Sequence, residues 1–344
     1  MRVSSAIVCV AFLANASAGA ECVGDLSADG AVDGNDLGAF LAQWGTPGSA
    51  DFNQDGVADG IDLGVLLANW GPCPVVTPAW ATLVEAFPDP AVVTNITLRR
   101  AIVSTGLAWR VRDTATQIEM LLTPPGSFQM GCTSGSSQFG CQSNEFPVHP
   151  VALTQAFYLG RYEVTQAQWQ TAIGANPSLF QGQPDSPLRP VDSVSWTMAQ
   201  AFLQVSGMRL PTEAEWEFAC RAGTTTAFHS GPGFPSGTSD DSLLPVIAWA
   251  GFASNGTMPV GQRAANSLGF HDMLGNVWEW VGDRYGPYPA TLQVDPVGPA
   301  AGSNRVIRGG GWSGDLYLVR SSARNYDPPG LAFNNYGFRV ARNP

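Results

Sequence analysis

Residues 25–36 read DLSADGAVDGND, and residues 51–62 read DFNQDGVADGID. Both stretches carry an oxygen-bearing side chain at the first, third, fifth, ninth and twelfth positions and a glycine at the sixth. With this spacing a loop wraps the oxygen ligands that calcium requires around one ion, and the glycine allows the sharp turn. The repeat therefore predicts two calcium loops and decides the fold of the N-terminal part of the chain. A solvated acidic linker would not need the two stretches to match.

The expected ligands use side-chain oxygens at every position except the seventh, where a backbone carbonyl serves. They are Asp25, Ser27, Asp29, Ala31, Asp33 and Asp36 in the first loop, and Asp51, Asn53, Asp55, Val57, Asp59 and Asp62 in the second.

Each loop runs into a stretch with apolar residues at helical spacing. These are Leu37, Phe40, Leu41 and Trp44 in the first repeat, and Leu63, Leu66, Leu67 and Trp70 in the second. Gly45 and Gly71 are expected to end the two helices. We expect the two apolar faces to bury each other, with calcium and a Cys22–Cys73 disulfide supporting the small core.

Residues 21–74 resemble the dockerin module, in which two loop-helix repeats dock onto a cohesin domain. The resemblance rests on the absence of a helix before either loop and on aspartate at the twelfth position. It implies a cohesin-like partner. The positions that read the partner in dockerins are Gly34-Asn35 and Gly60-Ile61 here, and they depart from the usual hydroxyl pair, so the identity of the partner stays open.

Residues 1–20 have the features of a secretory signal: Arg2, an apolar run over residues 6–13, and small residues near a cleavage point. The run is too short to span a bilayer, and no membrane span is expected. The mature protein is thus predicted to be secreted, in an extracellular, periplasmic or cell-surface compartment that permits disulfides. Cys22 with Cys73 and Cys132 with Cys141 are the expected pairs, although spacing alone does not fix connectivity. Cys220 is expected to be a buried apolar residue.

The charge of the chain excludes several classes of function. The net charge is -11, and residues 21–74 contain acidic residues and no basic one, so nothing in that segment could neutralise the phosphates of a nucleic acid. The chain has no lysine. Schiff-base chemistry and a P-loop are therefore excluded.

Residues 75–113 lack the repeat and are predicted to connect the module to a large domain at residues 114–344, with a helix following Asn95. In the large domain, strands are expected at residues 118–122 and 127–130. Helices are expected after Thr165, Ser195 and Thr212, where a hydroxyl residue starts a capping pattern.

Six motifs follow one another in the large domain: GRYEVT at 160–165, PVDSVSW at 190–196, RLPTEAEW at 209–216, GFHDMLGNVWEW at 269–280, RGGGW at 308–312 and GFR at 337–339. Together they resemble the formylglycine-generating enzyme family, also called sulfatase-modifying factors. The resemblance covers roughly residues 114–342. It implies an α+β, C-type-lectin-like fold that is rich in loops.

The resemblance also implies where the chemistry of the family would be. Its oxidases hold copper(I) with two cysteines, and the matching positions here are Gly314 and the vicinity of Val319. Thiolates select copper(I), so copper is not expected and no catalytic residue is assigned. A structural calcium ion is expected at Asp272, Gly275, Val277 and Glu279; the alternative is a turn held by hydrogen bonds alone.

A ligand groove is implied at residues that line the substrate groove of relatives: Trp278, Arg308, Trp312, Arg320, Arg324 and Arg339. It would receive a peptide or an anionic glycan. The alternative is that these arginines form buried pairs that tie long loops together. Two functions follow, a re-purposed ligand-binding domain or an enzyme, either a formylglycine-generating oxidase or one of another reaction. A structural part of a surface assembly is a third alternative.

Removal of calcium is expected to unfold residues 21–74, because closely spaced carboxylates then repel one another around a very small core. The measurement is far-UV circular dichroism before and after a chelator. We expect a loss of helical signal that calcium restores, and an unchanged spectrum would contradict the assignment of the loops.

Overall fold

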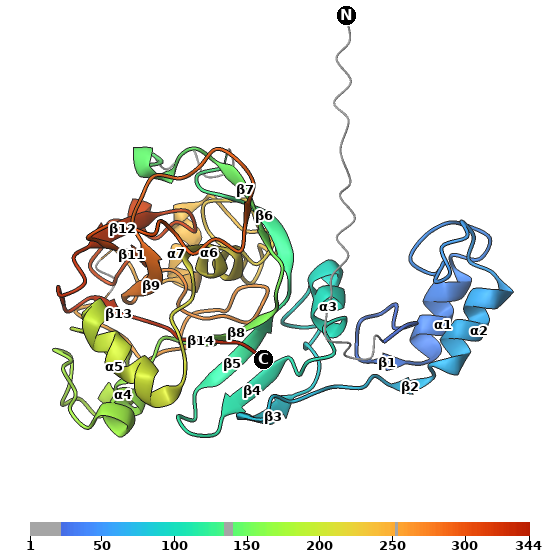
Figure 1. The fold of residues 1–344 in the computed structure, drawn as a ribbon, viewed down its shortest axis with the longest axis horizontal. Helices are drawn as coiled ribbons and strands as arrows, with labels where there is room; N and C mark the ends of the chain where they lie inside the picture. Colours follow the sequence, from blue (N-terminus) through green and yellow to red (C-terminus); the bar gives the residue numbers. More distant parts are fainter. Residues whose placement is uncertain (1–21, 134–139, 252–253) are drawn as a thin grey trace, which may run out of the picture.

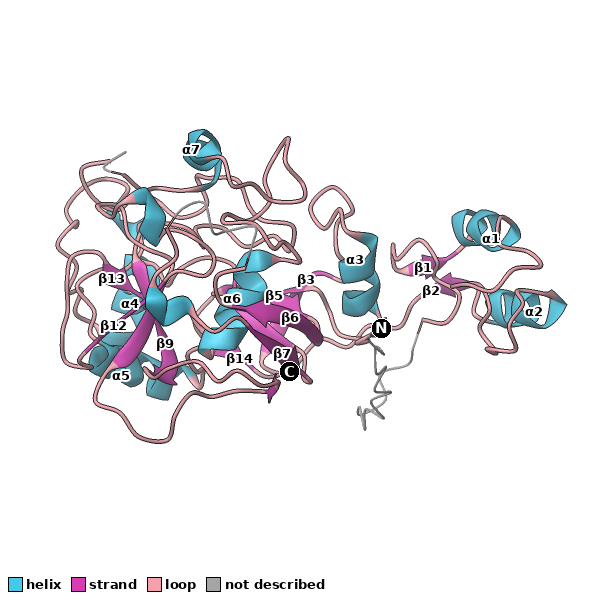
Figure 2. Ribbon diagram, turned by 90° about the horizontal axis from the view of Figure 1, so that it is seen from above, coloured by secondary structure: helices cyan, strands magenta, loops and turns pink. Residues whose placement is uncertain are grey.

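The computed structural model describes residues 22–133, 140–251 and 254–344 as a mixture of helices, strands and long loops. The predicted secretory signal at residues 1–20 lies outside the described residues. Figure 1 shows a large domain and a small helical module that projects from it, and Figure 2 shows the same separation from above.

A disulfide and a short two-stranded ribbon tie the start and the first loop of the module to its end. Strand β1 (Ala31–Val32) pairs antiparallel with β2 (Gly71–Pro72), and Cys22 forms a disulfide with Cys73 across Cα atoms 5.3 Å apart. Helices α1 (Gly34–Leu41) and α2 (Gly60–Ala68) follow the two acidic loops. The disulfide and ribbon therefore close both ends of the module at one place.

The core of the module is smaller than the sequence predicted. Phe40 and Leu66 are fully buried, whereas the four residues that follow on the predicted faces are half-exposed: Leu41 (54%), Trp44 (49%), Leu67 (52%) and Trp70 (50%). The mutual burial expected for these four is thus wrong. Both helices end before the tryptophan, at Leu41 and Ala68, so the helical period no longer applies to Trp44 and Trp70. For the same reason Gly45 and Gly71 lie a few residues beyond the helix ends. Leu41 and Leu67 lie within the helices, beside the buried Phe40 and Leu66, on the side that faces solvent.

The connecting segment is part of the large domain rather than a spacer. It contributes β3 (Ala81–Glu85), α3 (Ile96–Val103, capped by Asn95) and β4 (Arg110–Asp113). The two strands form one edge of a five-stranded sheet in the order β14-β8-β5-β4-β3. Strand β3 lies at the open edge of the sheet and none of its residues is fully buried, so its sequence, Ala-Thr-Leu-Val-Glu, lacks the strict alternation that would have revealed it.

The same sheet joins the start of the large domain to its end. Its remaining strands are β5 (Glu119–Thr123), β8 (Phe157–Gly160) and β14 (Ala341–Arg342), all antiparallel. The strand predicted at residues 118–122 is confirmed by β5, displaced by one residue.

Two further sheets complete the domain. One contains β6 (Gly126–Met130), β7 (His149–Leu153) and β10 (Gln293–Val294) in the order β10-β7-β6. The other has the order β12-β11-β9-β13 and contains β9 (Trp278–Arg284), β11 (Arg305–Arg308), β12 (Arg324–Asp327) and β13 (Tyr336–Gly337).

The three predicted helix starts are confirmed. Thr165, Ser195 and Thr212 accept a backbone hydrogen bond at the first turns of α4 (Gln166–Ile173), α5 (Trp196–Ser206) and α6 (Glu213–Arg221). A short helix α7 (Leu244–Ile247) was not expected. Helix α6 is almost entirely buried and contacts β6, β9 and β11. It therefore lies between two of the sheets and organises the core.

In the described part of the chain, no helix combines the length and the apolar character needed to cross a membrane.

Replacing Phe40 by alanine is expected to cost about 3–5 kcal/mol through the cavity that is left, which a module of this size cannot sustain. The neighbouring change Leu41→Ala, at a half-exposed site, is the matched control and should cost less than about 1 kcal/mol. Hydrogen exchange of peptides from residues 22–74 reports both. Equal exchange in the two variants would contradict this description of the core.

Candidate functional site

The two acidic loops have the same internal geometry. In the first, the Asp25 carboxylate accepts hydrogen bonds from the backbone nitrogens of Asp29 (3.2 Å) and Gly30 (2.9 Å). In the second, the Asp51 carboxylate accepts from those of Asp55 (3.1 Å) and Gly56 (2.9 Å). The loop thus closes around its first ligand position in both repeats.

The last position of each loop is equally well fixed. Asp36 is buried and accepts from the backbone nitrogens of Ser27 and Asp33, both at 2.8 Å. The equivalent Asp62 accepts from those of Asn53 (3.1 Å) and Asp59 (3.0 Å). These bonds orient the first and last carboxylates before any ion binds. The donor set of carboxylates and carbonyls suits a hard cation such as calcium.

Two details of the loops favour a cation. Gly30 and Gly56 have φ angles of +93° and +102°, which a residue with a Cβ adopts only with strain. Burial, followed by the nearby Asp36 and Asp29 carboxylates, raises the pKa of Asp25 above its ordinary value, although backbone hydrogen bonds oppose the rise. A bound cation would relieve that repulsion.

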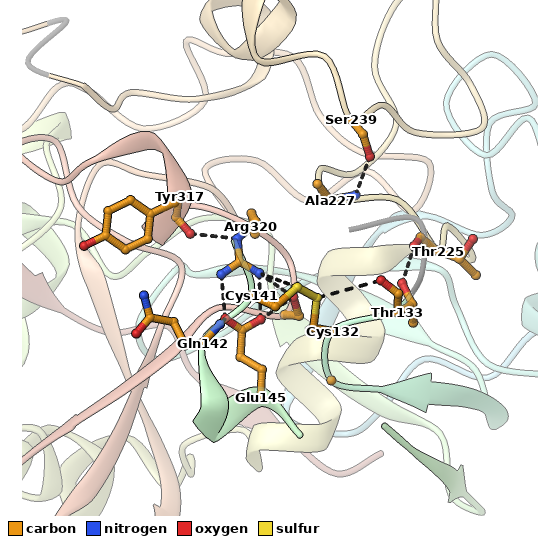
Figure 3. Close-up of a disulfide and its surroundings, with 12 residues drawn as sticks. Cys132, Thr133, Cys141, Gln142, Glu145, Thr225, Ala227, Ser239, Tyr317 and Arg320 are labelled. Carbon is orange, nitrogen blue, oxygen red and sulfur yellow. Dashed lines mark hydrogen bonds and ion pairs between the residues drawn. A yellow bond between two sulfur atoms is a disulfide. The ribbon is translucent and has the colours of Figure 1, made fainter. Parts of the chain in front are cut away.

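The second predicted disulfide joins Cys132 to Cys141, with Cα atoms 6.0 Å apart, next to a buried ion pair (Figure 3). Arg320 donates two hydrogen bonds to Glu145, at 2.6 and 2.5 Å, and Ser322 donates a third at 2.8 Å. Burial alone would raise the pKa of Glu145, but Arg320 holds it below its ordinary value. The disulfide thus joins Cys132 to Cys141, and the ion pair joins the neighbouring Glu145 to Arg320 in the C-terminal part of the chain.

The other three arginines of the predicted groove are also buried and paired with glutamate. Arg324 binds Glu213 with both contacts at 2.7 Å, Arg339 binds Glu279 at 2.6 Å, and Arg308 binds Glu217. Their charges are neutralised inside the protein and are not free to bind an anion at the surface. The sequence left open whether these arginines line a ligand groove or form buried pairs, and in the structure they form buried pairs. No sequence motif indicates which glutamates are the partners of these arginines.

The two tryptophans of the predicted groove differ in exposure. Trp278 is 4% exposed and belongs to the core. Trp312 is half-buried, its indole nitrogen donates to the backbone oxygen of Asn334 (3.3 Å), and its ring meets the edge of Phe180 with centroids 5.4 Å apart. The neighbouring Phe333 is 47% exposed. Trp312 and Phe333 are thus accessible apolar residues of this region.

The motif at residues 269–280 forms a tight, buried turn. Asp272 has a φ of +54° and is 1% exposed, and one of its oxygens accepts from the backbone nitrogen of Gly261 at 2.6 Å. A Cβ on Gly275 would lie 2.2 Å from the backbone oxygen of Trp249, so only glycine fits there. The other oxygen of Asp272, Oδ1, is buried and has no hydrogen-bond partner among the described residues.

The remaining predicted ligands of this turn fit a cation less well. Both oxygens of Glu279 are engaged, by Arg339 at 2.6 and 2.7 Å and by the indole nitrogen of Trp216 at 2.8 Å. The backbone nitrogen of Val277 donates to Glu163 (3.1 Å), a buried carboxylate that the sequence analysis missed. Asp272 is therefore the carboxylate available to a hard cation.

Electrostatics at the turn agree with this assignment. Burial, the largest cause, raises the pKa of Asp272 to about 6, and the Glu279 carboxylate adds to the effect. Burial also raises the pKa of Glu163 well above its ordinary value, with further contributions from Asp272 and Glu279. Three carboxylates thus share a buried region in which Arg339, and Arg263 at Asp272, are the opposing cations, and an additional positive ion would stabilise their ionised forms.

The positions that match the copper ligands of relatives hold no sulfur. Gly314 is half-buried and Val319 is fully buried against Gly310. Cys220 is the free cysteine of the described residues, and burial raises its pKa to about 12. A buried thiol of this kind is neither a nucleophile nor a ligand at neutral pH.

The histidines do not assemble a site either. His149, His229 and His271 each bond through Nδ1 to a backbone oxygen, at 3.1, 2.6 and 2.8 Å. Burial lowers the pKa of His229 and of His271 to about 4, so both are neutral at physiological pH.

Comparisons with known proteins agree with the motifs. Residues 108–344 match the family described as the sulfatase-modifying factor enzyme 1-like domain. The serine/threonine-protein kinase pkn1 of Chlamydia caviae is 33% identical over 250 residues, covering 65% of this chain and 38% of that protein. The formylglycine-generating enzyme of Bos taurus is 29% identical over 281 residues, covering 65% of this chain and 74% of that protein. The chain thus spans well under half the length of the chlamydial relative.

A solved structure shows the same fold. The Treponema denticola variable protein 1 superposes with a TM-score of 0.59 and 29% sequence identity, over 66% of this chain and 95% of its own.

Replacing Glu217 by alanine is expected to destabilise the large domain by about 3–5 kcal/mol, because the buried Arg221 then loses its carboxylate partner and the buried Arg308 keeps only a contact of 3.6 Å with Glu213. The control Glu85→Ala removes a partly exposed partner of Arg110 and should cost less than about 1 kcal/mol. Denaturant unfolding measures both. Similar midpoints for the two variants would contradict the structural role of the buried pairs.

Proposed function

The chain belongs to the sulfatase-modifying factor enzyme 1-like family, and from that premise we propose that it is a secreted ligand-binding member rather than a formylglycine-generating oxidase. The observation that carries the proposal is the loss of both copper-binding cysteines, at Gly314 and near Val319, in a chain with no cysteine after Cys220. Without two thiolates in reach of each other, the segment offers copper(I) no suitable ligands.

The ligand of the large domain is proposed to be a peptide. An anionic glycan would require accessible cations. The four arginines of the predicted groove are instead buried in internal ion pairs: Arg308, Arg320, Arg324 and Arg339. The accessible residues of the region are Trp312 and Phe333, whose rings can take the apolar side chains of a peptide.

The N-terminal module is proposed to bind two calcium ions and to tether the protein to a cohesin-like partner. The half-exposed Leu41 and Trp44 of the first repeat and Leu67 and Trp70 of the second provide an apolar surface for such a contact. The two disulfides agree with a secreted protein in an oxidising compartment.

A second candidate function is oxidation of a sulfatase cysteine, or another reaction, by an arrangement that does not use the two cysteines. The 29% identity to a formylglycine-generating enzyme over most of the large domain favours it. Relatives that lie this close in sequence can share a scaffold while differing in chemistry, because function depends on the residues of the site.

Mass spectrometry of a sulfatase-motif peptide distinguishes these functions. We expect the peptide to keep its cysteine after incubation with the full chain, copper and oxygen, because no thiolate pair binds the metal. A formylglycine-generating enzyme, such as the bovine relative, is the positive control. Conversion of the peptide cysteine to an aldehyde by this chain would overturn the proposal.

A calcium ion at Asp272 is proposed as a structural element of the large domain. Calcium at about 100 times its dissociation constant should then stabilise the domain by about 2.7 kcal/mol, and Asp272→Asn should remove this gain. Asp25→Asn, in the first loop of the module, is the control and should leave it intact. Calorimetric melting in calcium and in a chelator measures the stabilisation. Equal stabilisation of the wild-type chain and of Asp272→Asn by calcium would contradict the site.

A further inference from the structure

A cavity of about 300 Å³ lies beside the N-terminal end of α6, between β9 and the loop at residues 286–299. Its walls are largely apolar and include Pro287, Pro289, Pro296, Pro299, Val297 and Met130. This volume is at the lower end of those of ligand sites. The cavity does not involve the calcium loops, the turn at Asp272 or the Trp312 surface.

Most polar groups at the cavity bind one another. Arg324 donates to both oxygens of Glu213 at 2.7 Å and, through its remaining terminal nitrogen, to the backbone oxygens of Asn144 (3.2 Å) and Gly286 (3.0 Å). Tyr288 donates its hydroxyl to Glu213 at 3.0 Å, and its ring lies under the Arg324 guanidinium at 4.0 Å. Arg324 is therefore committed to these contacts and is not free to bind a ligand.

Asp283 is the exception. It lines the cavity and is 4% exposed. Its Oδ2 accepts from the backbone nitrogen of Glu213 at 2.8 Å, whereas its Oδ1 lies against Gly298 in the cavity wall and takes no hydrogen bond found among the described residues. An apolar cavity with one open carboxylate oxygen calls for a ligand that brings a donor and a positive charge.

The neighbouring arginines of the described ranges do not donate a hydrogen bond to Oδ1 of Asp283. Arg284, on the same strand, donates to the backbone oxygen of Ala300 at 3.0 Å. Arg305, on β11, donates to that of Gly282 at 2.6 Å and lies over the ring of Trp196. Neither guanidinium forms a hydrogen bond or an ion pair with Asp283 among the described residues, although, against the larger effect of burial, which lowers the pKa of Arg305, the Asp283 carboxylate raises it.

We propose that this cavity binds a primary alkylammonium group, with its nitrogen on Asp283 and its methylene chain against the prolines. A lysine side chain or a short free amine has this chemistry, and both fit a narrow apolar cavity. The chain itself contains no lysine. A lysine that enters the cavity would therefore belong to another kind of molecule and not to a second copy of this one.

Binding is coupled to loss of a proton. Burial and the Glu213 and Glu215 carboxylates raise the pKa of Asp283 to about 8, while Arg324 opposes the rise. Below that pH the empty site is mostly protonated, and an ammonium ion binds the ionised form. Affinity should therefore rise about tenfold between pH 6 and pH 7 and level off above pH 8, with up to one proton released per ligand.

Isothermal titration of the full chain with n-butylamine and with N-acetyl-lysine methylamide tests the proposal. We expect both to bind at pH 8, with heats that depend on the buffer because a proton is released, and Nε-acetylated lysine not to bind. Binding of butylamine alone would assign the site to free amines, and binding of both would extend it to lysine in peptides. Absence of binding by both, or equal binding of the acetylated form, would overturn the proposal.

Asp283→Asn should abolish binding, but Asp283 also holds the first turn of α6. Gln293 also lines the cavity, and its side-chain amide donates only to backbone oxygens and a hydroxyl of the two preceding residues. Substitutions at Gln293 should therefore have little effect on folding. Gln293→Glu should tighten and Gln293→Lys should weaken binding, each by about two- to fivefold at low salt. Identical affinities in the two variants would contradict binding of a cation in this cavity.

Discussion

Buried pairs of glutamate and arginine hold the large domain together. Helix α6 is their centre, since Glu213 and Glu217 reach Arg324 and Arg308 on the C-terminal strands, while Trp216 on the same helix bonds to Glu279. Removing charges from water is costly unless each is paired and hydrogen-bonded. Once formed, these pairs fix long loops that have little regular structure. This constraint explains how a domain with short strands and few helices keeps one conformation, and why its arginines are unavailable to ligands.

Local signals in the sequence predicted much of the fold. The hydroxyl caps at Thr165, Ser195 and Thr212 locate three helices because a cap is formed within one turn. Strand β3 could not be foreseen, because an exposed edge strand has little apolar pattern. The partners of the buried arginines were equally hidden, since Arg320 and Glu145 are far apart in the sequence and meet only in the folded chain. In the candidate sites, repetition revealed both acidic loops, whereas Glu163 and Asp283 carry no motif of their own.

The two parts of the chain use charge in opposite ways. The module concentrates carboxylates without basic partners, so its order is proposed to depend on an external cation. The large domain carries its own counter-ions and is proposed to use calcium only at the turn around Asp272. The family scaffold is retained while glycine and valine stand where thiolates would bind copper. Retention of the scaffold without its metal ligands is the basis for proposing a binding function.

The central claim is that this scaffold has lost its copper(I) site. Competition against a chromophoric copper(I) chelator under anaerobic conditions tests it most directly, because thiolate pairs withdraw the metal and change the absorbance of the chelator complex. We expect an equimolar amount of the full chain to leave the absorbance unchanged. Stoichiometric withdrawal of one copper(I) ion per chain would contradict it.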